Sequence, residues 1–284
     1  MANKTWFITG SSRGLGREIA LAALKKGDSV VATAREPSSL GDLLSHYGKK
    51  VLPIKLDVSN NNEVRAAVEE AFKYFGQIDV LVNNAGYANL ASIEDISISD
   101  FQDQVATNFF GVVYTMKAVL PFMRDQQRGS IINISSIGGR FGNAGLSAYQ
   151  SSKFAVNGFT EVLAQEVSSF GIKVTTLEPG GIATDWAGSS MNIPPISEPY
   201  QPIIGGTAKL LRNINSAAPE ERIGRLSDPA KVAGVVIQLA EMPEPPLHLL
   251  MGSSAFKIAQ EGAKKLAESD KRFEELTKST DYTD

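Results

Sequence analysis

The chain has no cysteine and two histidines among its 284 residues. Without cysteine it can form neither a disulfide nor a thiolate metal site. His46 and His248 stand far apart in the sequence and lack the spacing of a metal-ligand pair. The sequence therefore predicts that the protein binds no metal ion.

The chain also lacks a large excess of charge of either sign, and it lacks long apolar runs. The 28 Lys and Arg residues nearly balance the 31 Asp and Glu residues, the net charge is −3, and there is no basic block. Nucleic acid and anionic membrane surfaces are therefore not expected as partners. The longest apolar runs are shorter than a membrane span, and the N-terminus lacks the pattern of a signal peptide. We expect a cytoplasmic protein.

The chain does contain a regular alternation of short apolar runs and amphipathic helical patterns. The runs predict strands at 5–9, 30–34, 51–57, 78–82, 130–134 and 172–177, with a shorter one at 246–251. Between them, Ser59 is expected to cap one helix. Ser99 and Gln102 are expected to form the capping box of another, which runs to about Pro121. This alternation predicts an α/β fold, a doubly wound parallel sheet of Rossmann type, in a single domain at 1–284.

Polar and conformationally special residues gather where the predicted strands end. Gly10, Asp57, Asn83, Ser136 and Pro179 each close or follow a predicted strand. Ligands of doubly wound sheets bind outside the carboxyl ends of the strands. Core packing does not explain this concentration, so the sequence predicts a ligand site at this edge of the sheet.

A glycine-rich turn, with Gly10, Gly14 and Gly16, joins the first predicted strand to the first predicted helix. Glycines let the backbone approach a ligand closely, and the helix N-terminus offers N–H groups and a positive dipole to a phosphate. The spacing Gly-x3-Gly-x-Gly differs from the fingerprint Gly-x-Gly-x-x-Gly. The strand–turn–helix context nevertheless favours a nucleotide site over a purely structural turn.

Tyr149 and Lys153 stand four residues apart in a predicted helix and therefore share one of its faces. A neighbouring ammonium group favours the phenolate, so the spacing predicts a lowered pKa for Tyr149. Such a tyrosine could exchange a proton near neutral pH. Taken alone, the pair is better explained as two ordinary surface residues.

The segment at about 187–226 interrupts the regular pattern, being rich in Pro, Gly and Ser with one helical stretch at 207–213. Long irregular insertions are usually lids or binding loops, so we expect this one to cover the substrate; a tolerated surface insertion is the alternative. Asp228 and Pro229 predict the start of a further helix. A C-terminal extension at about 253–278 predicts a charged amphipathic helix that packs on the domain or on a second subunit.

Seven motifs occur in order along the chain. They are Thr9-Gly10-x3-Gly14-x-Gly16, Asp57-Val58, Asn83-Asn84-Ala85-Gly86, Asn108, Ser136, Tyr149-x3-Lys153, and Pro179-Gly180 followed by Thr184. Any one of them is weak evidence. The ordered set resembles the short-chain dehydrogenase/reductase family over roughly 4–185.

The resemblance implies an oxidoreductase that interconverts a ketone or aldehyde with an alcohol by hydride transfer. Tyr149 would be the acid/base, and Lys153 would lower its pKa and hold the nicotinamide ribose. Ser136, thirteen positions before Tyr149, would polarise the substrate carbonyl. Asn108 would anchor a water molecule of the proton relay.

The resemblance also implies two sets of binding residues. The cofactor set is Gly10, Ser12, Arg13, Gly14, Leu15, Gly16, Arg35, Asp57, Val58, Asn83, Ala85, Gly86, Tyr149, Lys153, Pro179, Gly180, Ile182 and Thr184, and the substrate set is Ser136, Tyr149, Gly181 and Trp186. Apolar residues of the lid predict a hydrophobic small-molecule substrate, such as a steroid-like, retinoid-like or aromatic one. An acyl-carrier substrate is less favoured because no basic patch is evident in the lid. A homodimer or homotetramer is compatible with the family.

The end of the second strand predicts NADP(H) over NAD(H). An acidic residue there would bind the ribose 2′-hydroxyl and repel a 2′-phosphate, but this chain has Ala34 followed by Arg35. Arg13, in the glycine turn, can face the same pocket, and two guanidinium groups suit a phosphate dianion. Glu36 could neutralise Arg35 instead.

Two other classes of protein remain as alternatives. A non-catalytic nucleotide-binding regulator on the same fold would be expected to lose Tyr149 or Lys153, and this chain keeps both. An epimerase or dehydratase of related fold usually has a different glycine spacing and a larger C-terminal region. The sequence favours the dehydrogenase/reductase.

Overall fold

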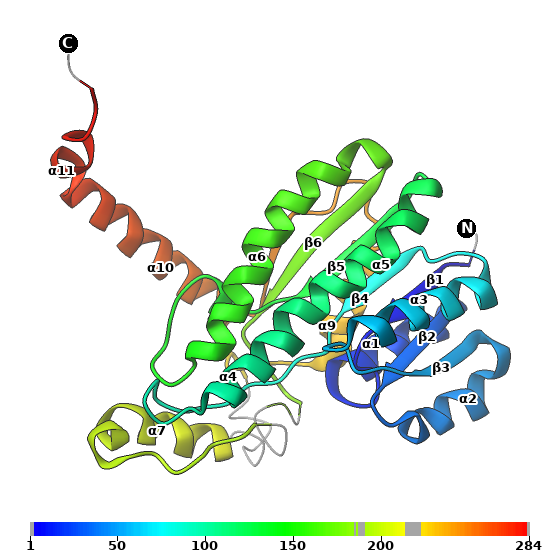
Figure 1. The fold of residues 1–284 in the computed structure, drawn as a ribbon, viewed down its shortest axis with the longest axis horizontal. Coiled ribbons are helices and arrows are strands. Elements are labelled where there is room, and N and C mark those ends of the chain that lie inside the picture. The colour runs from blue at the N-terminus through cyan, green and yellow to red at the C-terminus, as the bar shows by residue number, and fades with distance from the viewer. Residues whose placement is uncertain (1–2, 185, 187–190, 214–222, 283–284) are drawn as a thin grey trace.

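The centre of the molecule is a seven-stranded sheet in which every pairing is parallel, with the order β3-β2-β1-β4-β5-β6-β9 (Figure 1). The computed structural model describes residues 3–184, 186, 191–213 and 223–282. The strand order reverses between β1 and β4, the position at which doubly wound sheets bind ligands. The predicted Rossmann-type parallel sheet is therefore confirmed. Its strands are β1 (Thr5–Ile8), β2 (Ser29–Ala34), β3 (Val51–Lys55), β4 (Val80–Asn83), β5 (Gly129–Ile134), β6 (Ile172–Pro179) and β9 (His248–Met251).

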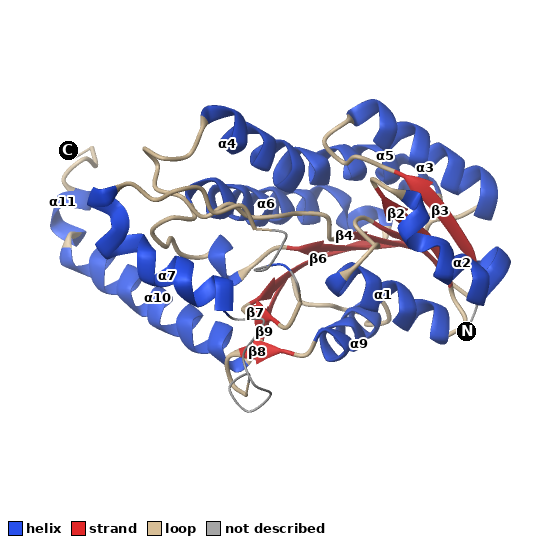
Figure 2. Ribbon diagram, turned by 90° about the horizontal axis from the view of Figure 1, so that it is seen from below, coloured by secondary structure: helices blue, strands red, loops and turns tan. Residues whose placement is uncertain are grey.

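The strands are apolar on both sides because helices cover both faces of the sheet. Trp6 and Ile8 face one layer and Phe7 faces the other, and all three side chains are fully buried. Figure 2 shows the two helical layers on opposite sides of the sheet. One contains α1 (Gly14–Lys25), α2 (Gly41–Tyr47) and α9 (Pro229–Leu239), and the other contains α3 (Asn61–Phe75), α5 (Gly111–Asp125) and α6 (Ser147–Val167).

Two of the expected helix caps are wrong. Asn60, and not Ser59, caps α3, since its side chain accepts hydrogen bonds from the main-chain N–H groups of Asn62 and Glu63. The Ser59 hydroxyl instead donates to Asp57 at 2.7 Å. Short polar side chains compete for nearby partners in this way, so a cap is hard to place from sequence to within one residue.

The second wrong cap is at α4 (Ile98–Val105), where Ser97 takes the place expected for Ser99. The Ser97 hydroxyl accepts from the main-chain N–H of Asp100 at 3.0 Å. The expected end of this helical run, at about Pro121, is also too early. The helix α5 includes Pro121 and ends at Asp125, and its buried face extends to Met123. The short helix α2 was not expected from the sequence.

The helical run at 98–125 is long and apolar enough, by length and composition alone, to cross a membrane. A π-helical turn, Ala106–Phe110, divides it into α4 and α5. The apolar face of α5 packs against the sheet through four buried residues, so its hydrophobicity is explained by the core. They are Val112, Met116, Val119 and Met123.

The lid and the C-terminal region are partly described. Within the expected lid, α7 (Gln201–Asn213) is longer than predicted, while 187–190 and 214–222 lie outside the described residues. Two short strands, β7 (Gly181–Ile182) and β8 (Leu226–Ser227), pair beside the main sheet. Asp228 caps α9 as predicted, accepting from the main-chain N–H groups of Ala230 and Lys231.

The C-terminal extension forms α10 (Ser253–Arg272) and α11 (Glu274–Lys278), which project from the body of the molecule (Figure 1). The predicted amphipathic helix is present, but it packs on the domain mainly through Ala255 and Ala259. Its larger apolar side chains, including Phe256 and Leu266, are exposed.

Candidate active site

Tyr149 and Lys153 lie in the first two turns of α6 and are both buried, with 8% and 6% of their surfaces exposed. The Lys153 ammonium is 5.7 Å from the centroid of the Tyr149 ring. It donates a 2.8 Å hydrogen bond to the main-chain oxygen of Ile134, the last residue of β5. The interpretation of this pair as ordinary surface residues is therefore wrong.

The expected lowering of the Tyr149 pKa is not found. Burial raises the pKa of Tyr149 to about 12, although a hydrogen bond with Ser136 acts in the opposite direction. Burial also lowers the pKa of Lys153 to about 8. Removal from water disfavours the charged form of each group, and the Lys153 ammonium is directed to Ile134. The phenol is consequently held protonated, which is the form that can donate to a carbonyl oxygen.

Ser136 follows β5 and caps the short 3-10 turn Ile137–Gly139. Its hydroxyl oxygen accepts from the main-chain N–H of Gly138 at 3.0 Å and also makes the contact with Tyr149. The neighbouring Ser135 directs its hydroxyl to the main-chain oxygen of Lys153, at 3.4 Å. The structure thus brings Ser136, and not Ser135, to the Tyr149 hydroxyl.

Asn108 lies in the π-helical turn and is fully buried. Its amide oxygen accepts from the Tyr87 main-chain N–H at 3.0 Å, and its amide nitrogen donates to the Tyr87 main-chain oxygen at 2.8 Å. The side chain therefore fixes the loop after β4, and the anchoring of a water molecule by Asn108 stays a prediction. A Cβ atom on Gly86 would lie 3.0 Å from the Asn108 amide oxygen and 3.8 Å from the Lys153 ammonium, so these three residues adjoin.

The glycine turn forms a close-packed cradle between β1 and α1. Gly10 and Gly14 have φ values of +70° and +58°, which favour glycine. A Cβ on Gly16 would lie 2.3 Å from the Gly10 oxygen, and one on Gly10 would lie 3.0 Å from the Cα of Ala85. The first turn of α1 carries no acidic residue, so its N–H groups face an environment suited to a phosphate. These residues fit the dinucleotide cofactor that the family implies.

Asn84 supports this cradle and was absent from the expected binding set. Its amide nitrogen donates to the main-chain oxygens of Thr9 and Gly10, both at 3.0 Å. Its main-chain N–H bonds the Thr9 hydroxyl at 2.9 Å. The signal was the Asn-Asn-Ala-Gly motif itself, whose second asparagine holds the turn.

Several other residues of the expected cofactor set reach the same edge. Thr184 lies next to Gly14, since a Cβ added to Gly14 would be 3.6 Å from the Thr184 Cβ. Arg13 and Arg35 are exposed. Burial raises the pKa of Tyr87, after β4, and the positive charge of Arg35 opposes that rise. Asp57, two residues after β3, accepts from the main-chain N–H of Ser59. Ser12 lies in the glycine turn, and Pro179 and Gly180 lie at the end of β6.

Other members of the two sets point elsewhere. The Asn83 amide donates to Asn133 and accepts from the Thr115 hydroxyl, inside the protein. Gly181 lies in β7 against Leu226, and its place in the substrate set stays a prediction. The side chains of three more residues lie in the two cores or pack against one of them. These are Leu15, Val58 and Ile182.

Trp186 and the apolar face of α7 cover Tyr149. The rings of Tyr149 and Trp186 are 5.2 Å apart. Ile204 and Ala208 of α7 are buried in the same apolar cluster as Tyr149. The described part of the lid therefore packs on the Tyr149 ring, and its role as a substrate cover stays a prediction.

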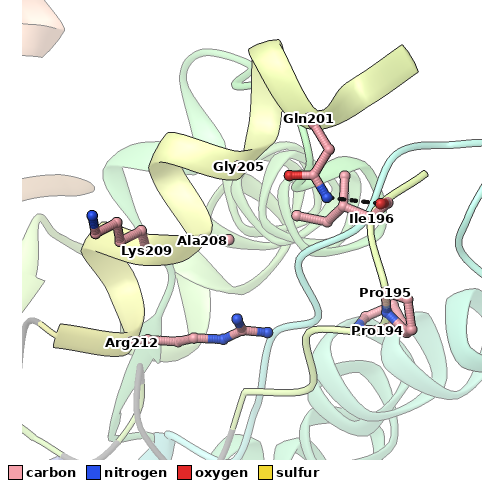
Figure 3. Close-up of a pocket in the computed structure, with 8 residues that line it drawn as sticks. All are labelled: Pro194, Pro195, Ile196, Gln201, Gly205, Ala208, Lys209 and Arg212. Atoms are coloured by element: carbon pink, nitrogen blue, oxygen red, sulfur yellow. Dashed lines mark hydrogen bonds between the residues drawn. The ribbon is translucent and has the colours of Figure 1, made fainter. Parts of the chain in front are cut away.

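A cavity of about 440 Å³ adjoins this cluster, with Ile196 and Ala208 belonging to both (Figure 3). Gln201 donates to the main-chain oxygen of Ile196 at its rim, at 2.8 Å. Arg212 extends toward Pro194 and Pro195. Basic residues thus occur in the lid, where the sequence suggested no basic patch. The lining residues are Pro194, Pro195, Ile196, Gln201, Gly205, Ala208, Lys209 and Arg212.

A doubly wound parallel sheet with a glycine turn at its switch point defines a Rossmann-type nucleotide-binding protein. The sequence profile described as short chain dehydrogenase matches residues 4–192. The chain belongs to the short-chain dehydrogenase/reductase family, which confirms the resemblance, and it is an oxidoreductase of that family that acts on a small-molecule substrate.

Individual proteins extend the comparison along the chain. Oxidoreductase BOA17 of Botryotinia fuckeliana is 54% identical over 96% of this chain and 98% of its own length. A short-chain dehydrogenase from Streptomyces avermitilis has a TM-score of 0.91 at 32% identity, covering 99% of this chain and all of its own. ElxO with NADP bound has a TM-score of 0.74 at 29% identity, covering 90% of this chain and all of its own.

Proposed function

We propose that the protein is an NADPH-dependent carbonyl reductase, or alcohol dehydrogenase in the reverse direction, in which Tyr149 transfers the proton. The observation that carries the proposal is the convergence of Ser136, Tyr149 and Lys153 in a buried site beneath an apolar cover. Burial excludes water and strengthens the electrostatic interactions of these groups with a bound carbonyl.

When bound, the cofactor supplies the hydride to the carbonyl carbon. The hydroxyl groups of Ser136 and Tyr149 polarise the carbonyl oxygen by hydrogen bonding. Tyr149 then gives its proton to that oxygen and becomes a phenolate. The Lys153 ammonium stabilises the phenolate until a proton from solvent restores the phenol. In oxidation, the phenolate removes the proton from the alcohol.

Arg35 supports a preference for NADP(H). It lies exposed at the end of β2, directly after the buried Ala34. A guanidinium group at this position can bind a 2′-phosphate, whereas an acidic residue would repel it. The NADP bound in the related structure of ElxO is consistent with this assignment.

The substrate that fits best is a hydrophobic ketone, aldehyde or secondary alcohol, since Trp186, Ile204 and Leu90 form the cover with Tyr149. Lys209 and Arg212, which line the cavity beside the cover, add compatibility with a carboxylate or phosphate on such a molecule. We also propose a cytoplasmic location and a homo-oligomer, as the sequence suggested.

The test is NADPH oxidation measured across a panel of carbonyl compounds, neutral and anionic, with wild type and Tyr149→Phe. We expect the wild type to reduce at least one apolar ketone or aldehyde, and the variant to do so about 10²–10⁴-fold more slowly while still binding NADPH. If both proteins bind NADPH and neither turns over any compound of the panel, the alternative of a non-catalytic binding protein replaces this proposal.

A further inference from the structure

Glu178 is a fully buried carboxylate in β6, one residue before Pro179. Three side chains hold it. Arg140 donates from Nε to Oε2 at 2.5 Å, Asn157 donates from Nδ2 to Oε1 at 3.0 Å, and His248 Nδ1 lies 2.8 Å from Oε1. A buried charge is costly unless it is paired and hydrogen-bonded. Such a fully bonded carboxylate therefore specifies where its partners lie.

The partners come from elements that carry the proposed catalytic groups. Arg140 ends the short turn that Ser136 begins. Asn157 follows Lys153 by one turn of α6. Glu178 thus connects the turn of Ser136 to the helix of Tyr149 and Lys153.

The packing between these elements leaves little room for adjustment. The Asn157 amide also donates to the main-chain oxygen of Gly139, at 3.3 Å. A Cβ on Gly139 would lie 2.8 Å from the Asn157 amide nitrogen and 3.0 Å from the Lys153 main-chain oxygen. A shift at Glu178 is therefore transmitted to both sides of the proposed site.

We propose that Glu178 is a positioning residue for the reaction, which sets the Ser136 hydroxyl against the Tyr149 and Lys153 pair. The inference rests on the proposed function of those three residues. A misplacement of reacting groups by about 1 Å can lower the rate about 100-fold. Loss of the carboxylate should accordingly act on turnover much more than on cofactor binding.

Glu161 provides a matched control on the outer side of the same network. His248 Nε2 lies 3.1 Å from the Glu161 carboxylate, whose side chain is 55% exposed. Glu161→Gln makes the same chemical change as Glu178→Gln, but at a bond that does not touch the turn of Ser136.

The experiment compares kcat, KM for the carbonyl substrate, Kd for NADPH and Tm in wild type, Glu178→Gln and Glu161→Gln. We expect Glu178→Gln to lower kcat at least about tenfold with Kd for NADPH within about twofold, and Glu161→Gln to keep kcat within about twofold. Wild-type kcat in a folded Glu178→Gln protein, or equal losses in the two variants, would overturn the inference.

Two further results keep the test decisive. If Glu178→Gln does not fold, Asn157→Ala is measured in its place, and unchanged kcat there overturns the inference. If both Glu178→Gln and Asn157→Ala fold, the double variant should lose no more kcat than the larger single loss, because the two residues act as one unit. A wild type that reduces no carbonyl compound contradicts the proposed function itself, which is a separate outcome.

Discussion

The Lys153 ammonium donates its 2.8 Å hydrogen bond to the main-chain oxygen of Ile134, and so joins α6 to the end of β5. The bond keeps a cation in a buried position, where its pKa is lowered to about 8 from an ordinary value of 10.5. A group whose pKa is lowered in this direction is a cation that the fold disfavours. The buried Lys153 ammonium is thus held at a cost in stability.

Lys153→Met should therefore stabilise the protein while abolishing activity. Below about pH 8 the wild-type fold must bury the ammonium, which costs about 3 kcal/mol by the pKa difference. Methionine removes that cost but also the bond to Ile134, so a gain of about 1–3 kcal/mol at pH 7 is expected. Thermal unfolding without cofactor measures it as a higher Tm.

The pH dependence of that gain provides its control. As the pH rises from about 8 toward 10.5, the folded wild type loses the lysine proton before the unfolded chain does, so its stability rises. The difference in Tm between Lys153→Met and wild type should shrink over this window. A difference that stays constant from pH 7 to pH 10 would show that burial of the ammonium is not its cause.

Tyr149→Phe should lower kcat by about 10²–10⁴-fold, the range expected when a general acid is removed. The ring keeps its contact with Trp186, and burial of an apolar ring is favourable, so the fold should be retained. Fluorescence titration with NADPH should give a Kd within about threefold of wild type. Residual activity above about a tenth of wild type would show that another group supplies the proton.

The strands were predictable because each is a buried apolar run between two helical layers, as Trp6, Phe7 and Ile8 illustrate. The proposed catalytic pair was also visible, since spacing alone places Tyr149 and Lys153 on one helix face. Glu178 was not predictable. A single acidic residue in a strand gives no sign of burial, and its partners come from residues 140, 157 and 248.

Electrostatic environment was likewise beyond the sequence. The spacing predicted that Lys153 lies beside Tyr149, but it did not predict that both groups are buried. Burial raises the pKa of Tyr149, whereas the spacing predicted a lowered one. In the same way, the sequence placed Asn108 in a helix, whereas its role depends on a π-helical turn that brings the amide to Tyr87.

Asn108→Asp should destabilise the fold by about 1–3 kcal/mol, because the amide donor to the Tyr87 main-chain oxygen becomes an oxygen. Gln104→Leu is the matched control, since Gln104 donates to the same oxygen at 2.8 Å. The Gln104 amide oxygen has no hydrogen-bond partner among the described residues, so Gln104→Leu should lower the free energy of unfolding by less than Asn108→Asp does. Urea denaturation measures the free energy of unfolding of both variants. A larger loss of stability in Gln104→Leu than in Asn108→Asp would contradict the assignment of Asn108 as the main support of Tyr87.

Gly16→Ala should damage the phosphate cradle, because the added Cβ would lie 2.3 Å from the Gly10 oxygen. Overpacking of this kind costs about 1–3 kcal/mol, and we expect Kd for NADPH to rise at least about tenfold. Gly158→Ala is the control, since its Cβ would meet no atom within 4 Å on an exposed face of α6. That change should stabilise the helix by about 0.5–1 kcal/mol and leave Kd unchanged.

Arg35→Ala should raise KM for NADPH by about tenfold or more and leave KM for NADH nearly unchanged. A hydrogen bond to a charged group contributes about 1.5–3 kcal/mol, and NADH lacks the 2′-phosphate that would receive it. Glu36→Ala is the companion variant. If Glu36 competes for the Arg35 guanidinium, its removal should lower KM for NADPH. Steady-state kinetics with both cofactors decide the point, and a wild-type KM for NADH equal to or below that for NADPH would contradict the assignment of NADP(H).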